Sequence, residues 1–273
     1  MALSTEELQE FLAFAHRLAD VAGAAILPFF RQAPAERNKS ATGGFDPVTA
    51  ADHAAEEAMR QLIRQRYPEH GIFGEEQGRH AGSGALTWVL DPIDGTRAFL
   101  TGIPLWGTLI ALNDGTAPVL GVMDQPFTGE RFVGSALGAW FLHRGHTTPL
   151  RVRACTSLGE ARLQCTDPRI FQPKERAAFD ELQSRVQLTR FSGDCYAYCM
   201  VALGCIDLVV ESGLQPYDVQ ALIPIIERAG GVMTNWRGGD CSGGGQVIAA
   251  GDPRVHAQAL EILAHAAAST HET

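Results

Sequence analysis

The most constraining feature of this sequence is a short apolar segment that ends in two closely spaced acidic residues. Residues 87–90 are Thr-Trp-Val-Leu, and Asp91-Pro-Ile-Asp-Gly-Thr96 follows directly. Pro92 fixes its own backbone angle and lacks an N–H donor. Asp94 comes three residues after Asp91, so a tight turn brings both carboxylates to one point. The pattern predicts a β-strand closed by a two-carboxylate turn.

The residues after this turn favour a binding site for a phosphate and a cation. Gly95 lets the backbone approach a ligand closely. If Gly95 and Thr96 open a helical turn, their free N–H groups can hold a phosphate. Two carboxylates beside such N–H groups suit Mg²⁺, a hard cation that prefers oxygen ligands. The simpler alternative is a turn followed by a helix cap, which explains an isolated Asp-Gly-Thr but is less satisfactory for the whole hexapeptide.

Three further acidic residues lie at predicted element ends. Glu75 follows the short apolar pair Ile72-Phe73, Asp46 precedes a predicted helix, and Asp218 begins another. Each has an ordinary explanation when taken alone. Asp46 and Asp218 can be helix caps, and Glu75 can be a solvated surface residue.

The chain of 273 residues is long enough for one large domain or two tightly packed halves. Hydrophobic spacing predicts helices at about 4–31, with a Ser4/Glu7 capping box, and at about 49–67. Strands with turn residues between them suggest a mostly antiparallel first sheet, and the second half alternates helices and strands. We therefore expect a layered α/β protein with two sheets. The predicted strands are 87–90, 108–112, 119–123, 131–135, 139–143, 206–210 and 247–250, and the later helices are 174–185, 194–203, 218–229 and 252–268.

Charge and composition exclude several classes of protein. The formal net charge of −9 is the opposite of that expected for a nucleic-acid-binding protein. The apolar stretch 11–30 is interrupted by His16, Arg17 and Asp20, so we expect no membrane span, no leader peptide and a cytoplasmic location. The six cysteines form no CxxC pair or zinc-site spacing, and we expect buried, reduced thiols. No histidine is assigned to catalysis or to metal binding.

These acidic segments together resemble the inositol monophosphatase superfamily of metal-dependent phosphatases. The resemblance rests on Asp46-Pro-Val-Thr-Ala-Ala-Asp52, Gly74-Glu-Glu76, Asp91-Pro-Ile-Asp-Gly-Thr96 and Pro216-Tyr-Asp218, the last followed by a helix ending at Gly230-Gly231. It implies a layered α-β-α-β-α sandwich of the inositol monophosphatase and fructose-1,6-bisphosphatase type. It also implies one continuous catalytic unit, with most metal ligands in an N-terminal α+β half (1–150) and Asp218 and an alcohol pocket in a C-terminal α/β half (151–273).

The resemblance implies a role for each acidic residue. Two Mg²⁺ ions, with a third weaker one near Glu75, would activate a water molecule. Thr96, bonded to Asp46, would orient that water together with Glu75, and the Gly95 and Thr96 amides would contact the phosphoryl group. No phosphorylated enzyme is expected. The implied ligands of the first ion are Glu75, Asp91 and the carbonyl of Ile93, and those of the second are Asp91, Asp94 and Asp218.

Within the superfamily the sequence is most similar to bacterial histidinol-phosphate phosphatases. The segments carrying this similarity are Leu90–Leu112, with Arg97 after the acidic motif, Gly193–Tyr198, and Ile206–Asp218, in which Gln215 stands where Lys is expected. The resemblance implies histidinol phosphate as the substrate and, from relatives, a homodimer. Glu211 and Asp194 are then candidate partners for the substrate's positive charge, and Lys39 for its phosphate. Trp106 and Tyr217 could stack on an imidazole, although packing is the simpler role for both.

Three functions remain open from the sequence. The first is histidinol-phosphate hydrolysis in histidine biosynthesis. The second is the same chemistry on another small phosphate, such as inositol monophosphate or a 3′-phosphoadenosine nucleotide. The third is a catalytically weak relative that binds a macromolecular partner. The complete acidic set argues against the third function, because a binding protein has no need of five carboxylates at these spacings.

Overall fold

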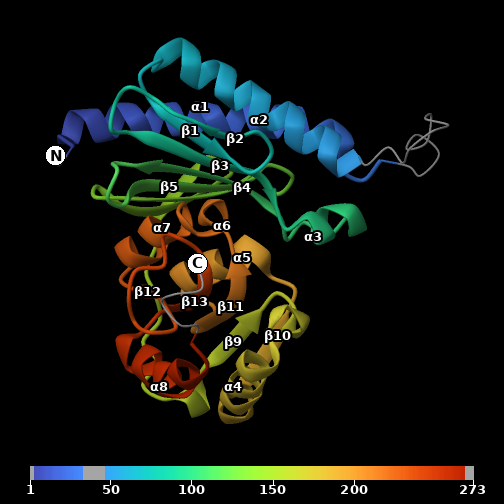
Figure 1. Cartoon of the computed structure of the whole chain (residues 1–273), viewed down its shortest axis with the longest axis vertical. Coiled ribbons are helices and arrows are strands. Elements are labelled where there is room, and N and C mark those ends of the chain that lie inside the picture. The colour runs from blue at the N-terminus through green and yellow to red at the C-terminus, as the bar shows by residue number, and fades with distance from the viewer. Residues whose placement is uncertain (1–2, 33–46, 268–273) are drawn as a thin grey trace.

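Helices and sheets alternate in five layers (Figure 1). The computed structural model describes residues 3–32 and 47–267. Helices α1 and α2 cover one face of an eight-stranded sheet, and α5, α6 and α7 lie between that sheet and a five-stranded one. Helices α4 and α8 cover the far face of the second sheet. The predicted α-β-α-β-α architecture is confirmed.

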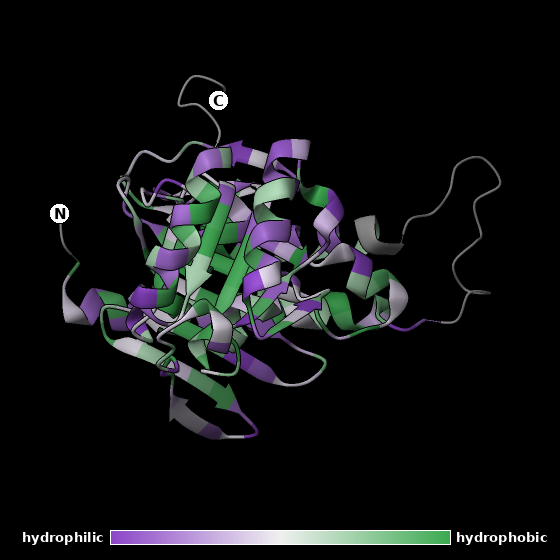
Figure 2. Cartoon of the chain, turned by 90° about the horizontal axis from the view of Figure 1, so that it is seen from below, coloured by the Kyte–Doolittle hydropathy of each residue, from purple (hydrophilic) through white to green (hydrophobic). Residues whose placement is uncertain are grey.

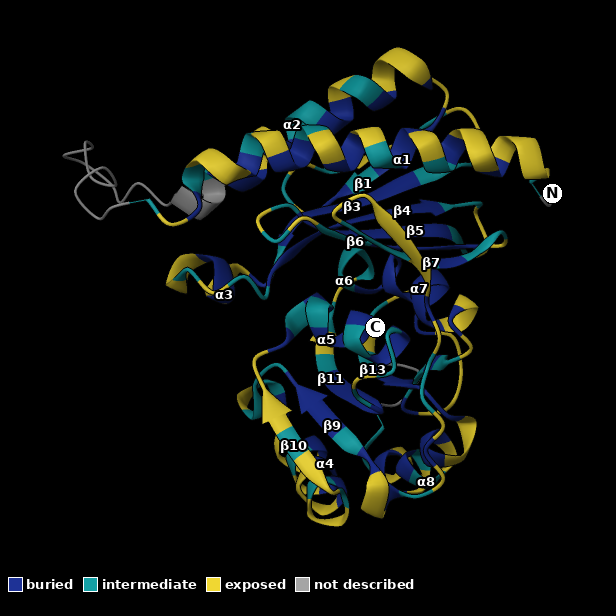
Figure 3. Cartoon of the chain, turned by 180° about the vertical axis from the view of Figure 1, so that it is seen from behind, coloured by how far each residue is buried: buried dark blue, intermediate teal, exposed yellow. Residues whose placement is uncertain are grey.

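The first layer consists of α1 (Thr5–Ile26), a 3-10 turn (Leu27–Phe29) and α2 (Pro47–Arg66). The predicted capping box between Ser4 and Glu7 is present. By length and hydropathy alone, Thr5–Phe29 could cross a membrane. In the folded chain its apolar face instead lies in the core against the first sheet, while the outward faces of both helices are exposed (Figure 3).

The first sheet has the strand order β2-β1-β3-β4-β5-β6-β7-β8. Every neighbouring pair is antiparallel except β1 and β3, which are parallel, so the expectation of a mostly antiparallel sheet is confirmed. The strands are β1 (Gly71–Gly74), β2 (Gly78–His80), β3 (Thr87–Asp94), β4 (Gly107–Asn113), β5 (Pro118–Gln125), β6 (Glu130–Ser135), β7 (Gly138–His143) and β8 (His146–Pro149).

The second sheet has the order β10-β9-β11-β13-β12 and mixes parallel and antiparallel pairs. Its apolar strands form the centre of the C-terminal part (Figure 2). The short strands β9 and β12 were not predicted from the sequence. The bounds are β9 (Arg162–Cys165), β10 (Leu188–Phe191), β11 (Leu208–Leu214), β12 (Val232–Asn235) and β13 (Gly245–Ala250), with α4 (Pro173–Arg185) and α8 (Pro253–Leu263) outside.

The middle layer corrects one prediction. The single helix expected over 218–229 is two helices, α6 (Pro216–Val219) and α7 (Leu222–Arg228). Pro224 explains the break, because it lacks the N–H that a continuous helix would donate to the carbonyl of Gln220. The third helix of the layer is α5 (Asp194–Ala202). The closing helix is also shorter than expected, since a 3-10 turn (Ala264–Ala266) follows α8.

The middle layer sits very close to the first sheet at Gly121 on β5. A Cβ atom at this position would lie 1.9 Å from the carbonyl oxygen of Ala221, between α6 and α7. Only glycine allows the helix backbone to approach the strand this closely. The sequence at this point therefore sets the position of α6, which carries Asp218.

We predict that Gly121→Ala destabilises the fold by about 1–3 kcal/mol or more, because the added methyl group overlaps backbone atoms that cannot move independently. Thermal or denaturant unfolding measures this change. The matched control is Gly159→Ala, where the added Cβ meets nothing within 4 Å. Equal stability of the two variants would contradict the close packing described for α6 and α7.

Candidate active site

Asp91 and Asp94 lie where β3 ends, as the sequence predicted. The strand is buried from Trp88 to Ile93, and its pairing with β4 is irregular between Asp91 and Asp94. The carbonyl of Pro92 accepts a hydrogen bond from Thr108 Oγ1 at 2.8 Å, which fixes the turn to β4. Asp91 Oδ1 is fully buried and has no hydrogen-bond partner among the described residues. A buried carboxylate oxygen without a donor calls for a cation or a proton.

Glu75 reaches the same site from β1. This strand pairs in parallel with β3, with Gly74 opposite Leu90, and the Glu75 N–H donates to the Leu90 carbonyl at 3.1 Å. Glu75 therefore stands beside Asp91 across the ladder. Glu75 as a whole is exposed, but its carboxylate is partly desolvated beside Asp91.

Asp218 comes from the other half of the chain. It is the third residue of α6, and its carboxylate accepts the Gln215 N–H at 2.7 Å. This cap fixes the start of the helix, so the capping role that the sequence left open for Asp218 is real. The same carboxylate also faces β3. Ligand oxygens of Asp91, Asp94 and Asp218 all lie within 4.8 Å of one another.

The cluster is electrostatically unfavourable without a cation. Burial, followed by the negative charges of neighbouring carboxylates, raises the pKa values of Asp91 and Asp94 well above the usual range. Burial raises the pKa of Asp218 to about 6. Partial desolvation and the charge of Asp218 also raise the pKa of Glu75. These shifts have the direction expected for carboxylates forced together in a site of low polarity.

The donor set fits Mg²⁺. It offers only carboxylate oxygens, which hard divalent cations prefer, and it includes the buried oxygen of Asp91 that no donor satisfies. In residues 3–32 and 47–267, no other group of three or more His, Cys, Asp or Glu residues brings its ligand atoms within 4.8 Å of one another. One ligand oxygen of the cluster is already engaged, since Asp94 Oδ2 accepts the Cys195 N–H at 2.6 Å.

The segment after Asp94 forms the predicted helical turn. Gly95 is left-handed, with φ of +89°, and precedes α3 (Thr96–Thr101). Thr96 is exposed, and its Oγ1 donates to the carbonyl of Ile93 at 3.4 Å. Asp46 and Lys39 lie outside the described residues, so their expected contacts with Thr96 and with the substrate phosphate stay predictions.

A cavity of about 170 Å³ opens beside the cluster. Asp94 and Asp218 line this cavity together with Asp194 and Glu211. The sequence analysis placed all four residues at one site, and the structure brings them together around one space. The remaining lining residues include Thr166, Ile170, Cys195, Tyr198, Ser212 and Leu222.

Glu211 is held at the bottom of this cavity by two donors. Its carboxylate accepts the Thr166 N–H at 2.8 Å and the Tyr198 hydroxyl at 3.1 Å. Burial raises its pKa to about 7 in spite of these bonds. The sequence analysis did not assign Thr166 or Tyr198. Tyr198 stood within the segment Gly193–Tyr198, but nothing local to Thr166 indicated that its amide meets Glu211, 45 residues later.

Asp194 is the first residue of α5 rather than its cap. Gly193 holds the cap position, and no side chain caps the helix there. Asp194 has an unusual φ of +45°, and its N–H donates to Thr166 Oγ1 at 3.1 Å. Burial raises its pKa to about 6, an effect that the nearby Arg97 partly opposes. Arg97 also pairs with Asp167, which precedes the second sheet's neighbouring helix α4, at 3.1 Å.

The two aromatic candidates, Trp106 and Tyr217, pack against other aromatic side chains, and the cysteines are free thiols. Trp106 is fully buried against Phe30 and Phe99, which confirms packing. Tyr217 packs edge-on against Phe73. Five cysteines are free and buried, as expected, but Cys205 is exposed, so the expectation of burial is wrong for that residue. It follows the end of α5, where the chain turns at Gly204 toward β11.

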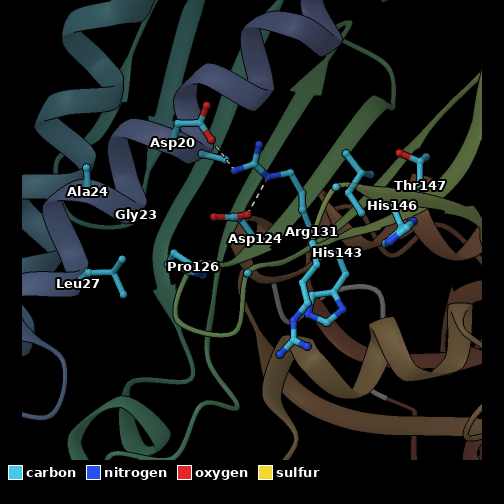
Figure 4. A pocket seen from close by; sticks show the side chains of 15 residues that line it. Asp20, Gly23, Ala24, Leu27, Asp124, Pro126, Arg131, His143, His146 and Thr147 are labelled. Atoms are coloured by element: carbon cyan, nitrogen blue, oxygen red, sulfur yellow. Dashed lines mark hydrogen bonds and ion pairs between the residues drawn. The ribbon is translucent and has the colours of Figure 1, made fainter.

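A larger cavity of about 690 Å³ lies away from the acidic cluster, between α1 and strands β5–β8 (Figure 4). Its two carboxylates already have a partner, because Arg131 donates to Asp124 at 2.7 Å and to Asp20 at 2.8 Å. His143 and His146 line it beside Arg131. It contains no cluster of unpaired carboxylates comparable to that of Asp91, Asp94 and Asp218 in the part of the chain described.

Comparison with known proteins agrees with this geometry. Residues 7–272 match the model of the inositol monophosphatase family. The chain is 42% identical to the bifunctional phosphatase IMPL2, chloroplastic, of Arabidopsis thaliana over 96% of this chain and 77% of that protein. It is 35% identical to a histidinol-phosphatase of Streptomyces coelicolor, covering 92% and 96% of the two chains.

A solved structure of an inositol monophosphatase from Zymomonas mobilis superposes with a TM-score of 0.86 at 42% identity, covering 96% of this chain and all of that one. The match therefore extends over both sheets and the helices between them. Sequence, fold and site agree that this chain belongs to the inositol monophosphatase family.

Proposed function

We propose that this protein is a Mg²⁺-dependent phosphatase that hydrolyses histidinol phosphate to histidinol and phosphate. The observation that carries the proposal is that carboxylates of the acidic cluster and a second pair of carboxylates line one small cavity. The first group suits a cation and a phosphate, and the second suits a positively charged alcohol. Inositol carries no positive charge, so it has no use for Asp194 and Glu211 as ion-pair partners.

We assign the metal ligands as follows. Asp91 would be shared by two Mg²⁺ ions, with Glu75 and the Ile93 carbonyl completing one set and Asp94 and Asp218 the other. A third, weaker ion near Glu75 is an extension of the same proposal. When bound, Mg²⁺ supplies a water molecule acidic enough to act near neutral pH and neutralises charge on the phosphoryl oxygens.

The chain's own groups would orient the reactants. Thr96, with Asp46 as its expected partner, and Glu75 would hold the attacking water in line with the phosphorus atom. The N–H groups of Gly95 and Thr96 would donate to phosphoryl oxygens as their charge grows, and Lys39 would add a positive charge. The leaving alkoxide takes its proton from water.

Glu211 and Asp194 would recognise the histidinol part. Thr166 and Tyr198 hold Glu211 in a fixed position, so little ordering is required when a substrate ammonium or imidazolium binds. A bound cation would also favour the ionised forms of both carboxyls. In the free protein the pKa of Asp194 is raised to about 6 and that of Glu211 to about 7. We expect an active homodimer in the cytoplasm.

Inositol monophosphate is the second candidate substrate. The similarity to the Zymomonas mobilis inositol monophosphatase supports it, since that chain matches this one at the same identity as IMPL2. Phosphate release with Mg²⁺, measured side by side on histidinol phosphate and inositol 1-phosphate with an EDTA control, tests the proposal. A preference for inositol 1-phosphate would overturn the assignment of Asp194 and Glu211 while keeping the metal chemistry.

We predict that Asp94→Asn lowers kcat by at least about a hundredfold, because the change replaces a charged metal ligand with a neutral one. The fold should persist, since the Asn oxygen can still accept the Cys195 N–H. The ionised form of Asp94 is disfavoured in the fold, so the metal-free variant should unfold at the same temperature as the wild type or higher near pH 7.5. The exposed Asp180→Asn serves as the control, and near-normal turnover of Asp94→Asn would refute the metal assignment.

We predict that Glu211→Gln raises KM for histidinol phosphate by about tenfold or more, because a charged hydrogen bond contributes about 1.5–3 kcal/mol. KM for inositol 1-phosphate should change far less, since that alcohol is neutral. A matched control is Glu175→Gln, which alters another buried carboxylate, one that accepts Ser212 Oγ behind the cavity. Equal losses on both substrates would show that Glu211 supports the cavity without selecting a cation.

A further inference from the structure

The segment that carries Glu75 is a short hairpin at the edge of the first sheet. Strands β1 and β2 are joined by Glu75, Glu76 and Gln77, with Gly74 opposite Gly78. Strand β2 is the outermost strand, so on its far side no further strand supports it. Three-residue hairpins at a sheet edge are held only by their own pairing unless another element covers them.

Helix α2 supplies that cover through one buried carboxylate. Glu56 is 0% exposed and accepts the backbone N–H groups of Glu76 at 2.8 Å and Gln77 at 3.0 Å. Arg60, one turn later and 2% exposed, donates to Glu56 at 2.7 Å. Arg60 also donates to the carbonyl of Gly78. The pair therefore holds the turn at two points: Glu56 binds its N–H groups, and Arg60 binds the carbonyl at its end.

The hairpin fits closely around this carboxylate. A Cβ atom on Gly74 would lie 2.2 Å from Glu56 Oε1, so any other residue at this position would push the turn away from α2. Glu75 follows Gly74 directly. Its own N–H is fixed on Leu90, beside Asp91, and the next two N–H groups are fixed on Glu56. The backbone before Glu75 is thus tied to β3, and the backbone after it is tied to α2.

Stability alone gives no clear reason for a buried ion pair at this point. Two buried charges lose much hydration, and apolar residues of similar volume often stabilise a fold as well or better. A carboxylate, however, can accept several N–H groups at once and thereby fix the direction of a loop. Side chains around a metal site need such support, because a loosely held ligand binds the ion weakly.

We propose that Glu56, paired with Arg60, is a positioning residue that holds Glu75 beside Asp91 for Mg²⁺ binding. The inference rests on the proposed function, since it assigns Glu75 as a ligand. Glu56 itself faces the hairpin backbone. It acts through the turn and takes no part in the reaction.

Glu56→Gln tests the proposal, because an amide keeps the shape of the side chain but cannot accept all three N–H groups. Calorimetric titration of the metal-free protein with Mg²⁺ measures affinity, and thermal unfolding measures stability. Asp207→Asn is the matched control. Asp207 is also fully buried, also accepts a backbone N–H, from Arg162 at 2.8 Å, and also pairs with an arginine, Arg153, but it precedes β11 in the other sheet.

We expect Glu56→Gln to weaken Mg²⁺ binding by about 10–100-fold, the usual effect of losing a group that orients a metal ligand. Asp207→Asn should lower the unfolding temperature without weakening Mg²⁺ binding. Hydrogen exchange at the amides of Glu76 and Gln77 should become faster in Glu56→Gln and stay unchanged in the control. If Glu56→Gln does not fold, Arg60→Lys keeps the buried charge but loses the guanidinium fork, and it should weaken Mg²⁺ binding in the same direction.

Mg²⁺ affinity within twofold of the wild type in a folded Glu56→Gln or Arg60→Lys variant would overturn the proposal. So would an equal loss of affinity in Asp207→Asn, since the effect would then follow general stability. These results are separate from the fate of the proposed function. A wild-type protein that binds Mg²⁺ but hydrolyses neither phosphate ester would refute the proposed function. The role of Glu56 would then still be decided by the Mg²⁺ titrations of the variants.

Discussion

The main constraint on this site is the repulsion among carboxylates that the fold forces together at the end of β3. Asp91, Asp94 and Asp218 gather within a few ångströms of one another. Burial and the charges of neighbouring carboxylates raise the pKa values of Asp91 and Asp94, and burial raises that of Asp218. In the metal-free protein, a raised pKa in the folded state means that stability falls as the pH rises from the usual value of 3.8 toward about 6, where Asp218 ionises. A divalent cation reverses this cost, because it binds the ionised forms.

Two sheets and the layer between them bring these groups together. The first sheet supplies Asp91 and Asp94 from one strand and Glu75 from its parallel neighbour, while the second sheet supplies Glu211. The middle layer contributes Asp194 and Asp218 from the starts of two helices. Its close approach to β5 at Gly121 fixes the distance between the halves. The cavity beside the cluster is therefore a product of how the layers stack, and neither sheet forms it alone.

Much of this was predictable from sequence because the signals are local. The strand before Asp91, the helical turn after Gly95 and the antiparallel character of the first sheet follow from hydrophobic periodicity and turn residues. Contacts between distant segments were not predictable from local patterns. Thr166 meets Glu211, and Glu56 meets the turn at Glu76, only after the sheets and helices have assembled. The break between α6 and α7 was missed because Pro224 lies in an otherwise helical apolar run.

The central claim is that the acidic cluster exchanges protons for a divalent cation. Calorimetric titration of the metal-free protein with Mg²⁺, in buffers of different ionisation enthalpy, gives the number of protons released on binding. Because burial raises the pKa of Asp218 to about 6, the account predicts that this carboxyl releases more of its proton on binding at about pH 6 than at about pH 8, and that binding is tighter at the higher pH. Binding without proton release at about pH 6, or no binding at either pH, would contradict it.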